Sequence, residues 1–122
     1  MRAILACGGT GGHINPAIAI ANAIKAEDPE AEILFIGAKV GLEGELVSKA
    51  GFPIEFIDIE GFIRKVSFHN AMVMLKLGRS MLQSRRIIKR FKPDVVIGTG
   101  GYVTGPVLLM ASKMRIPTLI HE

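Results

Sequence analysis

Residues 2–17, RAILACGGTGGHINPA, decide the fold of this chain. The stretch from Arg2 to Cys7 is short, mostly apolar and closed by glycines, which predicts a buried strand. Residues 14–26 carry apolar side chains at helical spacing, and Pro16 is expected in the first turn, where its missing N–H costs nothing. A strand, a glycine-rich turn and a helix in this order indicate the first unit of a parallel α/β sheet.

The same alternation continues to the last residue. Further strands are expected at 32–36, 53–59, 95–97 and 117–120, further helices at 42–49, 67–91 and 102–114, and a loop at 60–66. We expect Gly37 to stop the second strand. Short apolar strands separated by helices are typical of strands buried on both faces. The sequence therefore predicts an α/β fold: a Rossmann-like, doubly wound parallel sheet of about five strands with helices on both faces.

The bulk composition sets limits on function. The chain has 122 residues, of which 49% are hydrophobic, and this predicts one domain over residues 1–122. It contains no apolar stretch of 18 residues, so no membrane-spanning helix is expected, and the apolar start is too short for a signal peptide. The single Cys7 permits no internal disulfide and is expected to be buried and inert.

The glycine run GGTGGH at residues 8–13, here called the first glycine loop, predicts an anion site. Glycines let a ligand approach the backbone N–H groups, and the following helix N-terminus favours negative charge. The dinucleotide fingerprint is incomplete because Ile14 occupies its third glycine position, and no Gly-Lys-Ser/Thr follows for a P-loop. A phosphorylated, nucleotide-sugar-related substrate is therefore favoured over NAD or an NTP.

His13 ends this run at the start of the helix. The positive end of the helix dipole disfavours an imidazolium there, which leaves a neutral ring able to accept a proton. His13 is thus a candidate general base. The alternative is a histidine that only caps or packs the loop.

A second run, GTGGYVTGP at residues 98–106, repeats the arrangement after the strand at 95–97 and is called the second glycine loop. Ligands of such folds bind beyond the carboxyl ends of the strands, so the two loops are expected to form one polar cleft. The last predicted strand is followed only by His121 and Glu122, where a functional loop is expected to begin. We therefore expect this chain to be a fragment or an isolated domain.

Several motifs together resemble one known family. The residues at 8–17, 92–98, 100–106, 116–117 and 121–122 are similar to the amino-terminal domain of the MurG family of bacterial glycosyltransferases. The resemblance implies the amino-terminal half of a GT-B fold, which binds a lipid-linked acceptor and touches the membrane. The carboxyl-terminal domain, which supplies most of the UDP-GlcNAc site in that family, is expected to be absent here.

The resemblance also implies a reaction. The family moves GlcNAc from UDP-GlcNAc to the 4-hydroxyl of MurNAc in undecaprenyl-diphosphate-linked lipid I, with inversion, and forms lipid II in peptidoglycan synthesis. His13 is then the expected catalytic base, or alternatively a group that only orients the acceptor diphosphate. No cofactor or metal is expected. The expected substrate contacts are Thr10, Gly11, Gly12, Gly100, Gly101, Tyr102, Thr104 and Glu122.

Basic charge is concentrated in and around the helix at 67–91. Residues 61–93 hold nine of the fifteen Lys and Arg residues and no acidic one, in a chain of net charge +4. Val73, Leu77, Ile88 and Phe91 share one face and are expected to pack on the sheet. The other apolar and basic residues predict contact with an anionic membrane at Met74, Leu75, Arg79, Met81, Leu82, Arg85, Arg86 and Lys89.

The resemblance implies a peripheral protein on the cytoplasmic face of the bacterial inner membrane, which agrees with a membrane contact at this helix. A core helix with a solvated basic face is the alternative for residues 67–91. A second function class also stays open, namely a non-catalytic anchoring or acceptor-binding subunit of a two-chain UDP-GlcNAc transferase. A nucleic-acid partner is disfavoured because aromatic residues make up only 6% of the chain, with no Trp.

Overall fold

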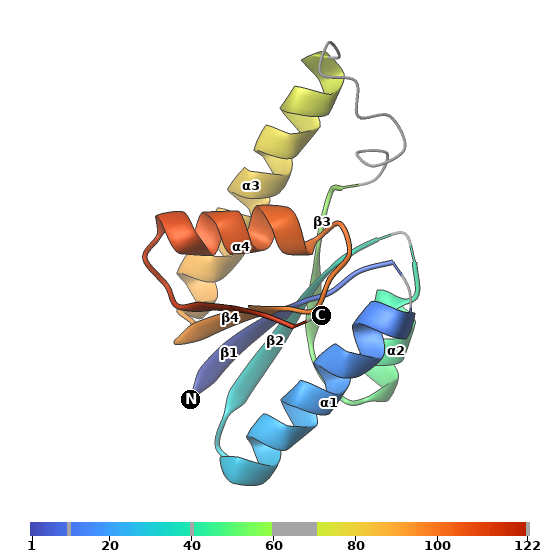
Figure 1. Ribbon diagram of the computed structural model, residues 1–122, viewed down its shortest axis with the longest axis vertical. Coiled ribbons are helices and arrows are strands. Elements are labelled where there is room, and N and C mark those ends of the chain that lie inside the picture. The colour runs from blue at the N-terminus through green and yellow to red at the C-terminus, as the bar shows by residue number, and fades with distance from the viewer. Residues whose placement is uncertain (10, 40, 60–70, 122) are drawn as a thin grey trace.

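The computed structural model describes residues 1–9, 11–39, 41–59 and 71–121 (Figure 1). Strands and helices alternate along the chain. They are β1 (Arg2–Ala6), α1 (Gly11–Glu27), β2 (Glu32–Ala38), α2 (Glu43–Lys49), β3 (Ile54–Ile57), α3 (Ala71–Phe91), β4 (Val95–Gly98), α4 (Thr104–Lys113) and β5 (Thr118–Ile120).

The five strands form one parallel sheet in the order β3-β2-β1-β4-β5. The chain builds outward from β1 to β3 and then crosses back to place β4 on the other side of β1. Leu5 of β1 thus lies between Phe35 of β2 and Ile97 of β4. The reversal creates a topological switch point at the carboxyl ends of β1 and β4, where folds of this kind bind ligands. The predicted Rossmann-like sheet is confirmed.

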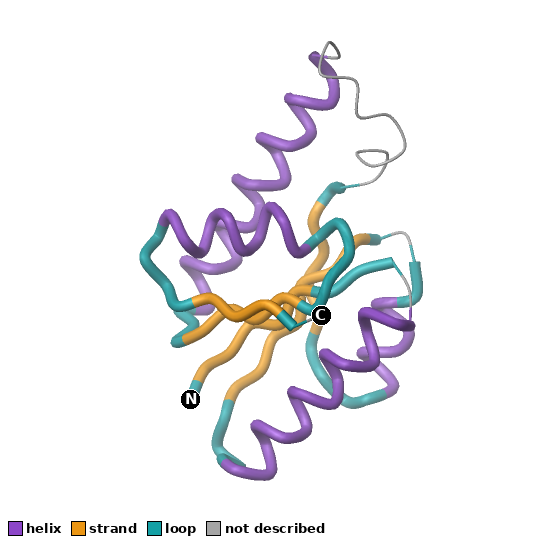
Figure 2. Tube along the Cα trace, in the orientation of Figure 1, coloured by secondary structure: helices purple, strands orange, loops and turns teal. Residues whose placement is uncertain are grey.

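Helices cover both faces of the sheet. α1 and α2 lie on one face and α3 and α4 on the other (Figure 2). Alternate side chains of β1 and the residue after it enter the two layers. Ile4 and Ala6 lie on the α3/α4 side, and Leu5 and Cys7 lie on the α1/α2 side. All four are fully buried. Cys7 is a free, buried thiol, as expected.

Several predicted boundaries were wrong, and three of the differences lie beside the glycine loops or within the sheet. β2 continues through Gly37, which pairs with Phe56 of β3, so this glycine does not stop the strand. α1 begins at Gly11, three residues earlier than predicted, and Pro16 therefore lies in its second turn. α4 begins at Thr104 instead of residue 102, which lengthens the second glycine loop.

The sheet-facing side of α3 is more polar than predicted. Ile87 and Ile88 are buried, but so are Ser80 and Ser84. The Ser84 hydroxyl donates to the Ser80 carbonyl at 2.8 Å, which satisfies it within the helix. Of the predicted packing face, Leu77 and Phe91 are half-buried, and the side chain of residue 73 lies outside the described ones. No helix among the described residues is long and apolar enough to span a membrane.

Candidate functional site

The two glycine loops meet at the switch point between β1 and β4. A pocket of about 390 Å³ opens there. It is lined by Gly12, His13, Pro16, Thr99, Gly100, Thr104, Ile120 and His121. The expected single cleft therefore exists in the described part of the chain, and it is bounded by α1, the second loop and the end of β5.

His13 and Thr99 join the two loops by a reciprocal pair of contacts. The Thr99 hydroxyl donates to the His13 carbonyl at 2.6 Å, and His13 Nδ1 lies 3.3 Å from the Thr99 carbonyl oxygen. Because a carbonyl can only accept, this second contact is a hydrogen bond when Nδ1 carries the proton. In the neutral ring Nε2 is then the nitrogen with the free lone pair. The arrangement suits a base whose tautomer is set by its neighbour.

The glycines of the second loop are needed for close packing against the first. Gly100 has φ +113°, and a Cβ there would lie 2.5 Å from His13 Nδ1. Gly101 has φ +89°, and its Cβ would lie 2.4 Å from the Gly8 carbonyl oxygen. Side chains at either position would push the loops apart. The two glycines therefore shape the cleft whether or not their N–H groups contact substrate.

The hydroxyl of Thr104 is engaged inside the loop. It accepts from the Gly100 N–H at 3.2 Å and lies within 3.0 Å of the Gly100 carbonyl and 3.3 Å of the Ala6 carbonyl. Thr104 still lines the pocket, but its hydroxyl braces the second loop against β1. Tyr102 is half exposed and does not line the pocket.

The start of α1 contributes a backbone group to the cleft. Pro16 cannot donate the helical bond that the Gly12 carbonyl would otherwise receive, and both residues line the pocket. The Gly12 carbonyl therefore lacks that helical bond beside the pocket. Gly11 opens the helix beside it, whereas the expected contacts at Thr10 and Glu122 lie outside the described residues.

Sequence reasoning missed two polar residues of the pocket. Thr99 and His121 both line it, but neither was among the predicted substrate contacts. The His121 N–H donates to the Gly98 carbonyl at 2.8 Å, which extends the β4–β5 ladder and fixes the residue at the cleft. The signal available was position, since both residues directly follow adjacent strands at the carboxyl edge.

Cys7 lies under the first glycine loop but takes no part in the pocket. Burial raises the pKa of its thiol to about 12, and the nearby charge of Glu43 adds to the rise. The thiolate is the reactive form of cysteine, so this residue is chemically inert near neutral pH. Among the described residues, no cluster of His, Cys, Asp and Glu side chains could hold a metal ion.

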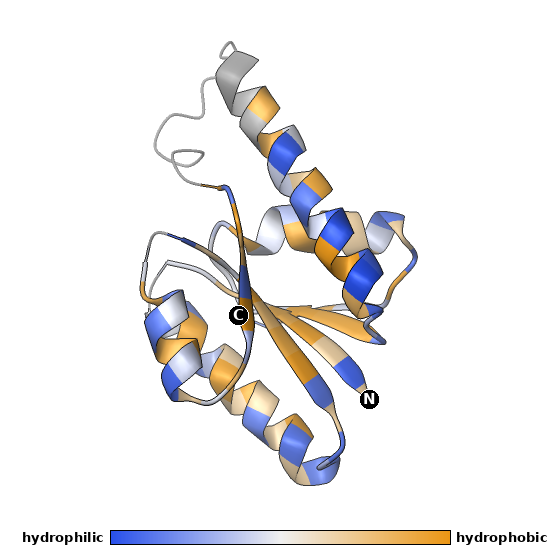
Figure 3. Ribbon diagram, turned by 180° about the vertical axis from the view of Figure 1, so that it is seen from behind, coloured by the Kyte–Doolittle hydropathy of each residue, from blue (hydrophilic) through white to orange (hydrophobic). Residues whose placement is uncertain are grey.

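The outer face of α3 carries most of the predicted membrane contacts. Leu75 and Leu82 are 68% and 62% exposed, and Arg86 and Lys89 are exposed as well. The four residues follow one another at spacings of seven, four and three residues, so they lie on one stripe of the helix. Met81 is half-buried, and the side chain of residue 74 lies outside the described ones. Figure 3 shows hydrophobic and hydrophilic segments alternating along this helix.

Two of the basic side chains are paired with acids from β3 and the segment after it. Arg79 Nε lies 3.4 Å from Asp58 Oδ2, and Arg90 binds the Glu55 carboxylate. Acidic side chains from outside residues 61–93 thus partly neutralise the basic charge that the sequence concentrates there. Arg85, Arg86 and Lys89 are exposed on the part of α3 that the structure describes.

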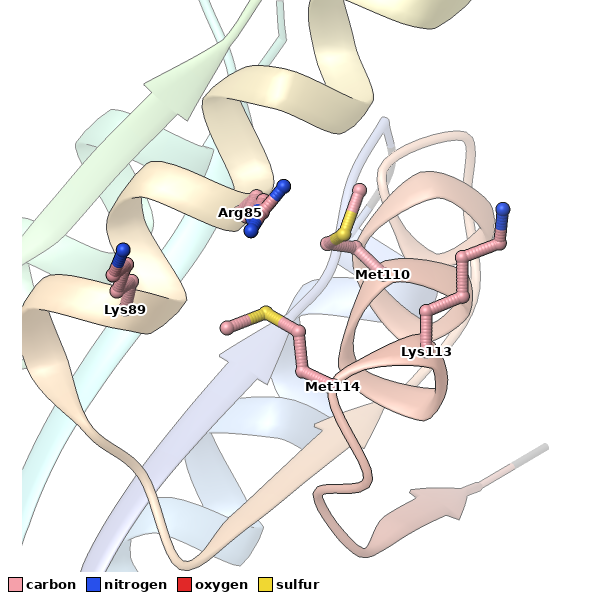
Figure 4. A pocket seen from close by; sticks show the side chains of 5 residues that line it. All are labelled: Arg85, Lys89, Met110, Lys113 and Met114. Atoms are coloured by element: carbon pink, nitrogen blue, oxygen red, sulfur yellow. The ribbon is translucent and has the colours of Figure 1, made fainter.

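A second pocket, of about 520 Å³, lies between α3 and α4. Met110 and Met114 point from α4 toward α3, and Arg85 and Lys89 lie on successive turns of α3 opposite them (Figure 4). An apolar floor with basic side chains at its edge continues the character of the exposed face of α3.

The sheet order and the pocket at its switch point define a Rossmann-type α/β domain. Residues 3–122 match the model of the glycosyltransferase family 28 N-terminal domain, and the chain therefore belongs to that family. Over all 122 residues it is 57% identical to a transferase of Alkaliphilus oremlandii and 54% identical to one of Clostridioides difficile. Both carry the name UDP-N-acetylglucosamine–N-acetylmuramyl-(pentapeptide) pyrophosphoryl-undecaprenol N-acetylglucosamine transferase. The chain spans 33% and 30% of their lengths.

Solved structures agree with this membership. The MurG crystal structure from Acinetobacter baumannii matches 99% of the chain with a TM-score of 0.83 and 33% identity, and the chain covers 35% of it. The glycosyltransferase SnogD from Streptomyces nogalater shares the fold, with a TM-score of 0.68 at 20% identity over 98% of the chain and 33% of its own length. The expected amino-terminal half of a GT-B fold is confirmed.

Proposed function

We propose that this chain is the acceptor-side domain of an inverting transferase. The enzyme moves GlcNAc from UDP-GlcNAc to the 4-hydroxyl of MurNAc in lipid I and so forms lipid II. One observation carries the proposal: over all 122 residues, the sequence is more than half identical to transferases named for this reaction. Because the chain spans about a third of their length, we infer that the remainder holds the donor site.

In the proposed reaction the acceptor hydroxyl oxygen bonds to the anomeric carbon of GlcNAc while the bond from that carbon to the UDP phosphate oxygen breaks. The hydroxyl proton passes to His13 Nε2, which the Thr99 carbonyl leaves free to accept it. The switch-point cleft supports this role because His13 lies in its wall together with groups that bind hydroxyls and phosphates.

We propose the remaining site residues as substrate contacts. N–H groups at Gly11, Gly12 and Gly101 are suited to diphosphate oxygens, and Thr10, Tyr102, Thr104 and Glu122 to sugar or phosphate. The Gly100 N–H already donates to the Thr104 hydroxyl, so Gly100 would act through the shape of its loop. The commitment of the Thr104 hydroxyl to Gly100 and Ala6 favours an indirect role for that residue.

We also propose that the protein binds the cytoplasmic face of the inner membrane peripherally. Exposed Leu75 and Leu82 would enter the headgroup boundary while Arg85, Arg86 and Lys89 contact anionic lipid. The location brings the cleft close to an acceptor that is itself anchored by a lipid.

The test is a transfer assay with the full-length protein, UDP-GlcNAc and a soluble lipid I analogue. We expect formation of the disaccharide product and release of UDP in equal amounts. The 122-residue chain alone should bind the acceptor analogue weakly and transfer nothing. If the full-length protein binds the analogue but releases no UDP, the non-catalytic acceptor-binding alternative is correct.

A further inference from the structure

Glu43 is a buried carboxylate that the proposed chemistry does not use. It is the first residue of α2, and its side chain is fully buried. A carboxyl group is costly to remove from water unless its oxygens are bound. Its position therefore needs a reason other than packing.

One oxygen of this carboxyl holds the first glycine loop. Glu43 Oε1 accepts from the Gly9 N–H at 2.6 Å, a short bond across 34 residues of sequence. Gly9 has φ +87°, a conformation that non-glycine residues avoid. The bond thus fixes the peptide that turns the chain out of β1 and toward the start of α1, where His13 lies. It also commits the Gly9 N–H to the protein, so this group is not available to a ligand.

Three glycines leave room for the Glu43 side chain. A Cβ on Gly8 would lie 3.1 Å from Oε1, one on Gly37 would lie 3.0 Å from the Glu43 Cβ, and one on Gly41 would lie 2.5 Å from Oε2. The glycine that we expected to stop β2 therefore serves to admit this side chain. The enclosure comes from three separate segments, which makes an incidental burial of Glu43 a poor explanation.

The second oxygen, Oε2, is buried and has no hydrogen-bond partner among the described residues. Among the described residues, the bond from the Gly9 N–H is therefore the one that ties this carboxyl to the site. A neutral amide of the same shape can accept the same bond from Gly9.

We propose that Glu43 is a positioning residue of the transfer site, which acts through the Gly9 N–H to hold the first glycine loop in its acceptor-binding shape. The expected change in kinetics rests on the proposed function, whereas the expected change in the first glycine loop does not. Hydrogen-bond acceptance, not negative charge, carries the role. Loss of the bond should weaken the acceptor site and leave the donor site, on the missing part of the chain, unaffected.

The experiment compares E43M and E43Q in the full-length protein. E43M fills a similar volume without a strong acceptor, whereas E43Q keeps an oxygen for Gly9. The matched control is E45M on the same helix, because Glu45 is exposed and bonds only Lys49 among the described residues. Kinetics with UDP-GlcNAc and a soluble lipid I analogue are measured together with hydrogen exchange of the peptide that covers residues 8–13.

We expect E43M to raise the KM for the acceptor analogue by about tenfold or more, the usual scale for a lost bond to a carboxylate. The KM for UDP-GlcNAc should not change. Exchange at residues 8–13 should become about tenfold faster or more, while β4 and β5 keep their protection. E43Q and E45M should match the wild type in both measurements.

Two results would overturn the inference. One is an E43M protein with unchanged exchange at residues 8–13 and an unchanged acceptor KM. The other is an E43Q protein as impaired as E43M, which would mean that charge or general packing matters and the bond to Gly9 does not. If the wild type transfers no sugar, the proposed function is wrong, and the exchange measurement still decides whether Glu43 holds the loop.

Discussion

Gly100 and His13 are in such close contact that a Cβ on the glycine would lie 2.5 Å from the imidazole Nδ1. The glycine lies in the second glycine loop and the histidine in the first turn of α1, so this contact sets how the two walls of the cleft meet. Thr99, the residue before Gly100, holds the same ring by its carbonyl. The position of His13 thus depends on the backbone of the opposite loop.

Gly100→Ala should therefore displace the His13 ring. We expect kcat for transfer to fall by about 100-fold, the scale of a misplacement of about 1 Å at a reacting group. The φ of +113° adds a backbone cost of roughly 1–2 kcal/mol to the free energy of folding. Steady-state kinetics of the full-length variant and thermal unfolding test both effects.

The matched control is Gly78→Ala on α3, where an added Cβ meets nothing within 4 Å. An alanine in this helix interior should stabilise the protein by about 0.5–1 kcal/mol and leave transfer to a soluble acceptor unchanged. Equal kinetic effects of the two substitutions would contradict the specific role of Gly100.

His13 itself can be tested with a pair of substitutions. His13→Asn keeps an amide N–H that can donate to the Thr99 carbonyl but removes the nitrogen that would accept the proton. His13→Ala removes both groups. If His13 is the base, both variants should lower kcat by about 100-fold or more at saturating substrates.

The same pair separates the two roles left open for this residue. A histidine that only orients the acceptor diphosphate should, when changed, raise the acceptor KM and leave kcat near normal. His13→Asn should then be the milder variant, because it can still donate a hydrogen bond. Normal kcat in His13→Asn would rule out the general-base assignment.

Cys7 should be unreactive in the folded protein. With a pKa of about 12, only roughly one thiol in 10,000 is ionised at pH 8, and the side chain is fully buried. Iodoacetamide should therefore label Cys7 only after unfolding in denaturant. Rapid labelling of the native protein would show that β1 opens under the first glycine loop.

The raised pKa also has a consequence for stability. The unfolded thiol ionises near pH 9 and the folded one near pH 12. As pH rises, the unfolded state therefore loses its thiol proton first. The contribution of Cys7 is fully present below pH 9 and is lost as pH rises toward 12. Chemical unfolding at pH 8 and pH 10.5 should show a larger loss for the wild type than for Cys7→Ala, which lacks the thiol.

Much of the fold follows from local sequence, since each strand is a short apolar run and each helix repeats apolar residues on one face. The predicted boundaries were wrong where contacts with other elements of the fold decide them. Gly37 remains within β2 because its missing side chain admits Glu43, a residue of the next helix. Local propensity contains no information about that contact.

The candidate site was predictable to the same extent. The order of the elements predicts that the two glycine loops meet, because parallel strands direct their carboxyl ends to one edge. The partners of individual side chains were not predictable, since Thr99 lies 86 residues from His13 and becomes its neighbour only through the strand order. The pairing of Arg79 on α3 with Asp58, which follows β3, was missed for the same reason.

The membrane proposal predicts a charge-dependent affinity that is confined to one helix face. Arg86 and Lys89 are exposed on the stripe that also carries Leu75 and Leu82. Each basic residue near an anionic surface contributes about 1 kcal/mol, so R86Q/K89Q should weaken binding to vesicles rich in anionic lipid by roughly 30-fold. Cosedimentation of the full-length protein with vesicles measures this.

The control for charge is Lys49→Gln on α2, which lies on the opposite face of the sheet and pairs with Glu45 (Figure 1). It removes a positive charge far from the proposed contact and should leave vesicle binding almost unchanged.

The control for the apolar component is L75S/L82S, which should weaken binding to neutral and anionic vesicles alike. Binding to neutral vesicles as tight as to anionic ones, or an equal loss in Lys49→Gln, would show that the basic stripe of α3 does not contact the membrane.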